Sequence, residues 1–250
     1  MIEQQISLRT RDGVMETFIC HPERDSAHPI VIVYMDAFGI REELRDMVRR
    51  IATTGYYVML PNLYYRSGVM EIARMPSMDD KEGVARILGY MAQIPISAVM
   101  RDTETLFEHA ASQSAASPGS AATVGYCMSG QYAIGAAGHF SDRITAAVSI
   151  YGTRLLTDES DSPHLAALRA KGELYVAFAE IDHFVPLEEY ERFRRHVADA
   201  GIRAEVELYA GFEHGFAFPA RESYNKTAAE RHWERIHSLL RRKLPTRLSS

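Results

Sequence analysis

The sequence predicts an α/β fold in which a mostly parallel β-sheet carries helices on both faces. Two observations lead to this prediction: short apolar runs recur along the chain, and amphipathic helical patterns lie between them. Apolar residues make up 46% of the 250 residues and charged residues 24%, which are ordinary values for a globular protein with a substantial core. We therefore expect one domain over residues 1–250.

The apolar runs are rich in β-branched and aromatic residues, and Gly, Pro or charged residues bound each of them. Such runs are typical of strands that are buried on both faces of a parallel sheet. The predicted buried strands are 30–34, 56–60, 123–126, 144–150, 174–178 and 204–208. Before them we expect an antiparallel hairpin of residues 3–8 and 14–20, because Arg11-Asp12-Gly13 supplies a turn.

Helical patterns fill the intervals between these strands. Two stripes of apolar residues are each closed by a glycine, and they comprise Leu44, Met47, Val48, Ile51 and Ala52 before Gly55, and Leu187, Tyr190, Phe193, Val197 and Ala200 before Gly201. Another helix is predicted over about 97–111, and an amphipathic helix over about 224–240. We interpret the basic tail 241–247 as the solvated end of that last helix.

Two segments interrupt the alternation of strand and helix. Residues 64–96 carry four Met and two Pro, and we expect an irregular excursion near the mouth of the active site. Residues 111–122 are rich in Ser and Ala, and we expect a surface loop before a buried strand.

Charge and cysteine content exclude several classes of protein. With 28 basic and 33 acidic residues the net charge is −5, so we expect no binding to nucleic acid or to an anionic membrane. The apolar runs are far shorter than the roughly 18 residues of a membrane span. Cys20 and Cys127 are too few for a disulfide framework, and residues 1–10 do not read as a secretory segment. We expect a cytoplasmic protein, either a monomer or a small homo-oligomer.

The most specific local pattern runs from Thr123 to Gln131 and joins a strand to a helix through a turn of small residues. It is typical of a nucleophile elbow in which Cys127 occupies the position usually taken by Ser. Gly125 and Ser129 supply the small residues that such a strained turn requires. The alternative is a buried cysteine that acts as a small apolar side chain, which is our interpretation of Cys20.

A nucleophilic thiol requires a base, and the base requires an acid that orients it. Asp182 follows the predicted strand 174–178, and His214 follows the strand 204–208. Nucleophile, acid and His in this chain order are typical of α/β hydrolases. Alternatively, Asp182 caps a helix or tightens a turn, and His214 is an exposed loop residue. We interpret His183 as structural.

An acyl-transfer site also requires an oxyanion hole. The backbone amides of Ala37, in the loop after strand 30–34, and of Met128, directly after the thiol, are the predicted donors. Beside them, Asp36 either modulates the thiol or only braces the loop. Aromatic residues near the mouth predict a pocket for a flat or apolar acyl group, and our candidates to line it are Phe38, Tyr64, Phe184 and Phe216.

Together these motifs resemble those of the dienelactone hydrolase (carboxymethylenebutenolidase) family of α/β hydrolases over about residues 2–240. The segments that carry the resemblance are Asp36-Ala37-Phe38-Gly39, Pro61-Asn62-Leu63-Tyr64, Gly125-Tyr126-Cys127-Met128-Ser129-Gly130, Asp182-His183-Phe184-Val185-Pro186 and Gly211-Phe212-Glu213-His214-Gly215-Phe216. The resemblance implies a catalytic triad of Cys127, Asp182 and His214. It also implies a lactone or ester substrate, such as a dienelactone from aromatic-compound breakdown, and hydrolysis through a Cys thioester without a metal or organic cofactor.

Two positions depart from the family pattern. Asp36 stands where members commonly carry a Glu that holds the resting Cys. Phe218, four positions after His214, stands where an Arg commonly pairs with the substrate carboxylate; the candidates to replace that Arg are Arg66, Arg74, Lys81 and Arg86. The sequence therefore leaves open a carboxylesterase of different acyl specificity, a redox-active thiol protein without turnover, or a binding module.

Overall fold

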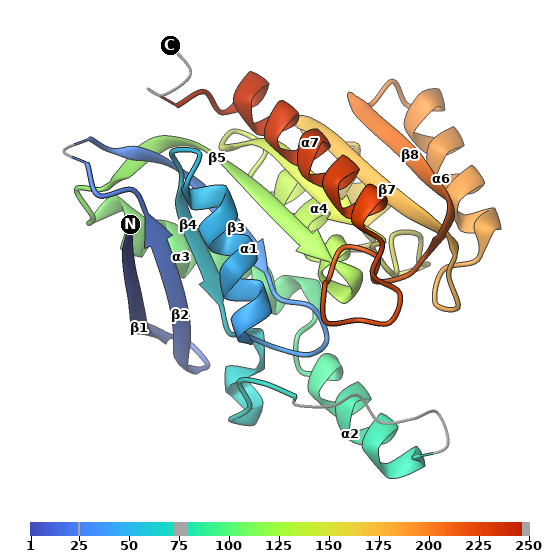
Figure 1. The fold of residues 1–250 in the computed structure, drawn as a ribbon, viewed down its shortest axis with the longest axis horizontal. Coiled ribbons are helices and arrows are strands. Elements are labelled where there is room, and N and C mark those ends of the chain that lie inside the picture. Colours follow the sequence, from blue (N-terminus) through green and yellow to red (C-terminus); the bar gives the residue numbers. More distant parts are fainter. Residues whose placement is uncertain (25, 73–79, 247–250) are drawn as a thin grey trace.

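The computed structural model describes residues 1–24, 26–72 and 80–246. Eight strands in this part of the chain form one sheet in the order β1-β2-β4-β3-β5-β6-β7-β8 (Figure 1). The strands are β1 (Ile2–Thr10), β2 (Gly13–His21), β3 (His28–Tyr34), β4 (Tyr57–Pro61), β5 (Ala116–Tyr126), β6 (Ile144–Ile150), β7 (Glu173–Ile181) and β8 (Ala204–Glu213).

The sheet is mostly parallel, as predicted. β1 pairs antiparallel with β2, and β2 pairs antiparallel with β4, whereas the other strand pairs of the described residues are parallel. The register Thr10↔Gly13 closes the predicted N-terminal hairpin. Because β3 and β5 to β8 run in one direction, their carboxyl ends meet along one edge of the sheet.

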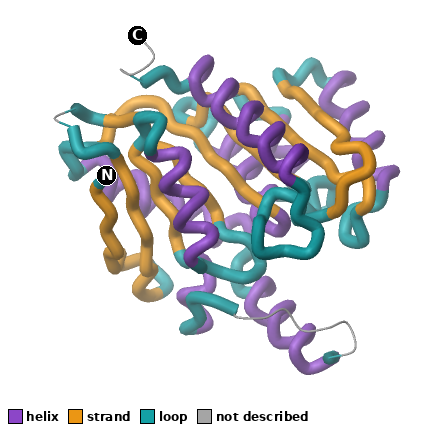
Figure 2. The backbone as a smooth tube through the Cα atoms, in the orientation of Figure 1, coloured by secondary structure: helices purple, strands orange, loops and turns teal. Residues whose placement is uncertain are grey.

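Helices cover both faces of the sheet, which confirms the predicted fold class (Figures 1 and 2). On one face lie α1 (Glu42–Ala52) and α7 (Lys226–Lys243); on the other lie α3 (Ile96–Ala111) and α4 (Gly130–His139). The remaining helical segments are α2 (Lys81–Ala92), α5 (Pro163–Ala167), α6 (Leu187–Asp199) and the 3-10 turns η1 (Leu63–Ser67) and η2 (Cys127–Ser129).

The apolar stripes explain how the helices dock. All five predicted stripe residues of α1 are buried. Acidic residues in its first turn and basic residues in its last turn suit the helix dipole. In α6, Phe193 and Val197 are buried, while Leu187 at the first turn is 45% exposed, because this helix lies beside β8 at the edge of the sheet.

Two segments differ from the sequence-based expectation. β5 already begins at Ala116, within the expected loop 111–122, and Ala121 and Ala122 pair with β3 on one side and β6 on the other. Small alanines suit such a central position, but their composition resembles that of a loop. The expected irregular segment 64–96 contains the regular helix α2, which the Asp80 side chain caps by accepting from the Gly83 amide. Residues 73–79 of this segment lie outside the described residues.

α2 lies apart from the two helical layers, at the lower end of the view in Figure 1. Within the described ranges, no single helix is long and apolar enough to cross a membrane. Taken together, α2 and α3 are long and apolar enough for a membrane span by length and composition alone, but the two helices are bent by 58° at the break between them.

Candidate active site

The turn between β5 and α4 places Cys127 in a left-handed backbone conformation, with φ of 54°. This conformation costs an L-residue on the order of 1–3 kcal/mol, so the surroundings must enforce it. A Cβ on Gly125 would clash with the carbonyl of Ser129, and one on Gly130 would lie 2.5 Å from the Cα of Gly152. Glycine at 125 and 130 therefore permits the turn, and the Cys127 side chain is partly exposed at its tip.

Ser129 has a role beyond its small size. Its hydroxyl is buried and donates a hydrogen bond to the Met35 carbonyl at the end of β3. On the other side, the Thr153 amide donates to the Cys127 carbonyl over 3.1 Å. The turn is thus tied to the loops after both strands that flank β5.

Asp182 and His214 stand directly after the neighbouring strands β7 and β8. Nδ1 of His214 lies 2.7 Å from Oδ2 of Asp182, and both side chains are almost fully buried. The other carboxylate oxygen, Oδ1, accepts hydrogen bonds from the amides of Phe184 at 2.8 Å and Val185 at 3.2 Å. Asp182 therefore both tightens its own turn and orients the imidazole.

The electrostatics of His214 link it to Cys127. Burial acts to lower the pKa of His214, but the charge of Cys127 and the hydrogen bond to Asp182 outweigh burial and raise the pKa to about 9. The Nε2 atom is buried and has no hydrogen-bond partner among the described residues. The ring packs against Tyr151 at 4.7 Å and against Phe184 at 5.0 Å, measured between centroids. These contacts fix an imidazole that can hold a proton next to a thiolate.

The loop after β3 provides the second predicted oxyanion donor. The amide of Phe38 donates to the Asp36 side chain at 3.0 Å, and the amide of Gly39 donates to the Asp36 carbonyl at 3.1 Å. Among the amides of this loop, the one at Ala37 is therefore the candidate to bind an oxyanion. The other predicted donor, at Met128, lies in η2 directly after the thiol.

Tyr64, predicted to line the substrate pocket, has a different position. It is fully buried in η1, and its hydroxyl lies 3.2 Å from the Ala37 carbonyl and 3.5 Å from the sulfur of Met128. The Asn62 side chain caps η1 and turns Tyr64 inward. Tyr64 thus braces the two residues whose amides are the predicted oxyanion donors.

Asp36 is fully buried and lies between two arginines. Its carboxylate accepts hydrogen bonds from Arg41 at 2.7 and 3.1 Å and from Arg221 at 2.6 Å. Both guanidinium groups also pack on the ring of Phe218, at 4.8 and 5.0 Å. These bonds occupy both carboxylate oxygens, which favours the bracing role among the two that the sequence leaves open for Asp36.

Sequence reasoning missed both cations beside Asp36, Arg41 and Arg221. Arg221 follows His214 by seven positions rather than by four. Of the arginines considered as replacements, Arg66 is paired with Asp12 and Asp102. Arg74 lies outside the described residues. Lys81 and Arg86 are exposed on α2.

The other three predicted pocket aromatics differ in exposure. Phe216 is fully buried and stacks on Tyr209 at 4.6 Å, so it belongs to the core, contrary to the prediction. Gly215, with φ of 90°, turns the chain inward at this point, which the sequence pattern does not show. Phe184 is 61% exposed beside His214, and Phe38 is partly buried under Arg221. Phe38 and Phe184 are therefore the two that can face a substrate.

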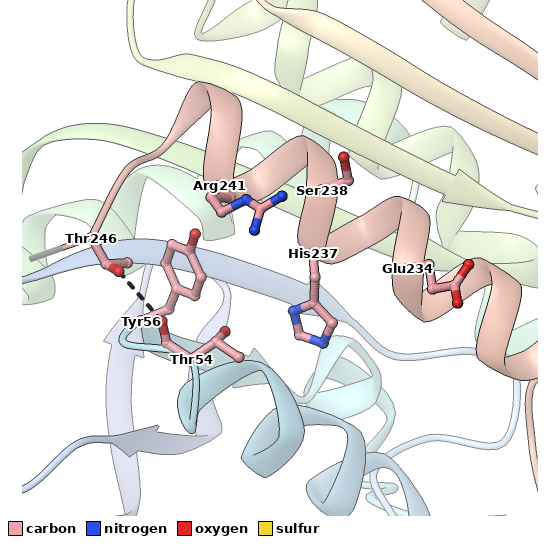
Figure 3. A pocket seen from close by; sticks show the side chains of 7 residues that line it. All are labelled: Thr54, Tyr56, Glu234, His237, Ser238, Arg241 and Thr246. Atoms are coloured by element: carbon pink, nitrogen blue, oxygen red, sulfur yellow. Dashed lines mark hydrogen bonds between the residues drawn. The ribbon is translucent and has the colours of Figure 1, made fainter. Parts of the chain in front are cut away.

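Two cavities of the described residues differ in their distance along the chain from the proposed nucleophile. One of about 540 Å³ is lined by Gln131 of α4, by Arg154 and by apolar residues of α2 and α3. It adjoins the elbow, because Gln131 donates to the Met128 carbonyl at 2.9 Å. Another, of about 460 Å³, is lined by residues of α7 and the segments beside it (Figure 3). None of the predicted site residues lines either cavity. Within the described part of the chain, no group of three or more His, Cys, Asp or Glu is arranged to hold a metal ion.

The mostly parallel sheet with helices on both faces, and the sharp turn between β5 and α4, have the architecture of the α/β-hydrolase class. The chain belongs to the dienelactone hydrolase family, whose sequence model matches residues 15–244. It is therefore an enzyme that hydrolyses esters or lactones.

Relatives over nearly the whole length agree with this assignment. The chain is 28% identical to a putative carboxymethylenebutenolidase of Escherichia coli O157:H7 over 239 residues, covering 92% of this chain and 83% of the relative. It is 24% identical to one of Synechocystis, with 91% of each chain covered. A putative dienelactone hydrolase of Klebsiella pneumoniae has the same fold, with a TM-score of 0.83, 24% identity, and 95% and 97% of the two chains covered.

Proposed function

We propose that Cys127, Asp182 and His214 form a catalytic triad that hydrolyses a small ester or lactone through a thioester on Cys127. The observation that carries this proposal is the left-handed Cys127 at the tip of the strand-to-helix turn, beside a His214 that Asp182 orients over 2.7 Å. A redox-active thiol requires only a thiolate, so the buried Asp182–His214 pair favours turnover over sensing.

The first half of the reaction forms the thioester. The Cys127 thiolate attacks the ester carbonyl carbon, the C–S bond forms, and the carbonyl electron pair moves onto oxygen. The amides of Ala37 and Met128 donate to this oxyanion. When the oxyanion collapses, the C–O bond to the leaving group breaks, and His214 gives its proton to the departing alkoxide.

The second half releases the acid. His214, now neutral, takes a proton from a water molecule, and the resulting hydroxide attacks the thioester carbon. The C–S bond breaks, and the thiolate and the protonated imidazole are restored. Each step uses groups of this chain, the substrate and water.

The pairing of the two arginines beside Asp36 favours an acyl group without a carboxylate. Phe218 occupies the position where the family commonly has an Arg, and Arg221 and Arg41 are both paired with Asp36. An anionic substrate would have to displace a buried carboxylate from these arginines, which costs free energy. This supports a carboxylesterase of different acyl specificity as the second candidate. From the family resemblance we also propose a cytoplasmic enzyme that acts on products of aromatic-compound breakdown.

Steady-state hydrolysis of a dienelactone and of a neutral aryl ester tests both candidates, using wild-type protein and Cys127→Ala at equal concentration. We expect turnover that depends on Cys127, with the higher kcat/KM for the neutral ester. A Cys127→Ala protein with wild-type turnover would refute the triad. A higher kcat/KM for the dienelactone would refute the proposed acyl preference while keeping the mechanism.

A further inference from the structure

A buried tyrosine beside the proposed nucleophile has no part in the reaction as written above. Tyr151 directly follows β6 and is fully buried, with φ of 37° in the left-handed region. Its amide donates to the Ala177 carbonyl of β7 over 2.7 Å, which holds the residue in place. Left-handed backbone at a bulky residue costs free energy, and such strain collects at functional sites.

The hydroxyl of Tyr151 is buried and has no hydrogen-bond partner among the described residues. Two other buried tyrosines have bonded hydroxyls: that of Tyr34 lies 2.7 Å from the hydroxyl of Thr103, and Tyr132 donates to the Ile94 carbonyl at 2.8 Å. An unmade buried hydrogen bond is unfavourable, so a hydroxyl left in this state calls for a partner that forms during function.

The surroundings of Tyr151 place it at the reaction centre. Its ring packs on the imidazole of His214 at 4.7 Å, and the loop that it begins returns to the elbow, where the Thr153 amide bonds the Cys127 carbonyl. Burial raises the pKa of Tyr151 well above its usual value, and the negative charges of Asp36 and Cys127 act in the same direction. The hydroxyl therefore keeps its proton at neutral pH and can donate it in a hydrogen bond.

We propose that Tyr151 is a further catalytic residue, whose hydroxyl donates a hydrogen bond to the Cys127 sulfur when the thiolate forms. The proton stays on the tyrosine oxygen, and no covalent bond changes at Tyr151. The bond stabilises the thiolate and holds the sulfur beside His214 in the orientation for attack. This inference rests on Cys127 being the nucleophile proposed above.

Other ionisable groups near Cys127 already have partners. From the loop after β8, His214 is bonded to Asp182. Tyr64 of η1 is bonded to the Ala37 carbonyl. Asp36 after β3 and Arg221 are bonded to each other. Apart from Nε2 of His214, which Asp182 leaves unpaired, the Tyr151 hydroxyl is the donor among these groups that a thiolate can recruit.

The experiment compares Tyr151→Phe with the matched variant Tyr34→Phe, which removes a buried hydroxyl that does have a partner. The readout is the rate of Cys127 alkylation by iodoacetamide against pH, with the modified peptide identified by mass spectrometry. We expect Tyr151→Phe to slow alkylation about tenfold near pH 7, because the thiolate then lacks the hydrogen bond that stabilises it. We also expect kcat to fall about tenfold with KM unchanged, without a loss of thermal stability.

For Tyr34→Phe we expect wild-type alkylation and a lower thermal midpoint, because a satisfied buried bond is lost. If Tyr151→Phe alkylates and turns over like the wild type, the proposal is wrong. A lower thermal midpoint with an unchanged alkylation profile would also overturn it, since Tyr151 would then be only structural. Alkylation needs no substrate, so a slowed profile in a protein without esterase activity would support the hydrogen bond from Tyr151 to the thiolate but reject the proposed function and, with it, a catalytic role for Tyr151.

Discussion

Single residues of the site are coupled through the proton on His214. Burial alone would lower the pKa of His214, and the charge of Cys127 is the largest influence that raises it, to about 9. A negative charge beside the imidazole favours the protonated ring, so removal of that charge must lower the pKa of His214.

We therefore predict that Cys127→Ala lowers the pKa of His214, since burial persists while the thiolate charge is gone. An NMR titration of the His214 ring in both proteins measures this directly. His183, the neighbour of Asp182 that we interpret as structural, provides the control resonance. A His214 titration that is the same in both proteins would show that the thiol does not face the ring.

Tyr64 carries a second prediction at this scale. Tyr64→Phe releases the Ala37 carbonyl and the Met128 sulfur, which loosens the two predicted oxyanion donors without changing the pocket surface. We expect kcat to fall about tenfold with KM unchanged, because the lost contact supports the transition state. Tyr56→Phe, which removes a hydroxyl bonded to the Leu244 carbonyl away from the site, should keep wild-type kcat. Equal kcat values in the two variants would contradict a bracing role for Tyr64.

Sequence reasoning at this scale predicts Cys127, Asp182 and His214 as the triad, because order and local motif mark them, and in the structure Asp182 and His214 lie 2.7 Å apart. It did not find Arg221, Tyr64 as a brace, or Tyr151, because no spacing rule shows which side chains a loop folds inward. Phe216 illustrates the same limit: an aromatic residue in the loop after β8 reads equally well as pocket or core, and only the packing on Tyr209 decides.

The elbow between β5 and α4 depends on glycine at two positions. A Cβ at Gly130 would lie 2.5 Å from the Cα of Gly152, a backbone atom that cannot move away cheaply. We predict that Gly130→Ala destabilises the protein by about 1–3 kcal/mol and lowers kcat, because the turn that presents Cys127 must shift.

Gly89→Ala is the matched control for that variant. Gly89 lies on the exposed side of α2, and a Cβ there would meet nothing within 4 Å. This substitution should stabilise the protein by up to about 1 kcal/mol through helix propensity. Chemical denaturation of both variants measures the two effects, and a Gly130→Ala protein as stable and active as the wild type would contradict the close approach.

Helix α7 places His232 in the core, where burial lowers its pKa to about 3 and its Nε2 lies 3.3 Å from the Tyr126 hydroxyl. Because the unfolded chain takes up this proton at about pH 6.5, stability is full above that pH and falls as the pH drops towards 3. We predict that the wild type loses on the order of 2 kcal/mol more than His232→Gln between about pH 7 and pH 5. Urea denaturation at both pH values tests this, and parallel losses in the two proteins would contradict it.

Helices and strands with a strong apolar pattern lie where the sequence predicts them. The buried strands and the stripe of α1 lie where predicted, because their apolar periodicity reflects the packing that stabilises them. The start of β5 and the helix α2 were not predicted from the sequence. Ala and Ser have little preference for strand, and in α2 only Gly83 and Ile87 are buried, so its core stripe is thin.

Across the whole molecule, the site exists because parallel strands end together. Residues from the loops after β3, β5, β6, β7 and β8 meet at one edge, although they are up to 185 positions apart in the pair Asp36 and Arg221. The alternation of strand and helix was enough to predict this edge. The balance of charges at this edge of the sheet was not predictable, because Arg41 and Arg221 contact Asp36 from segments that no sequence motif connects.

Mass spectrometry of the protein mixed rapidly with a neutral aryl ester, and quenched in acid before steady state, tests the proposed nucleophile most directly. Thioester chemistry predicts a mass increase equal to one acyl group on the peptide that contains Cys127, and His214→Ala should slow the appearance of this adduct. Cys127→Ala should show neither the adduct nor turnover. Wild-type turnover in Cys127→Ala, or an acyl group found on a different residue, would contradict the proposal.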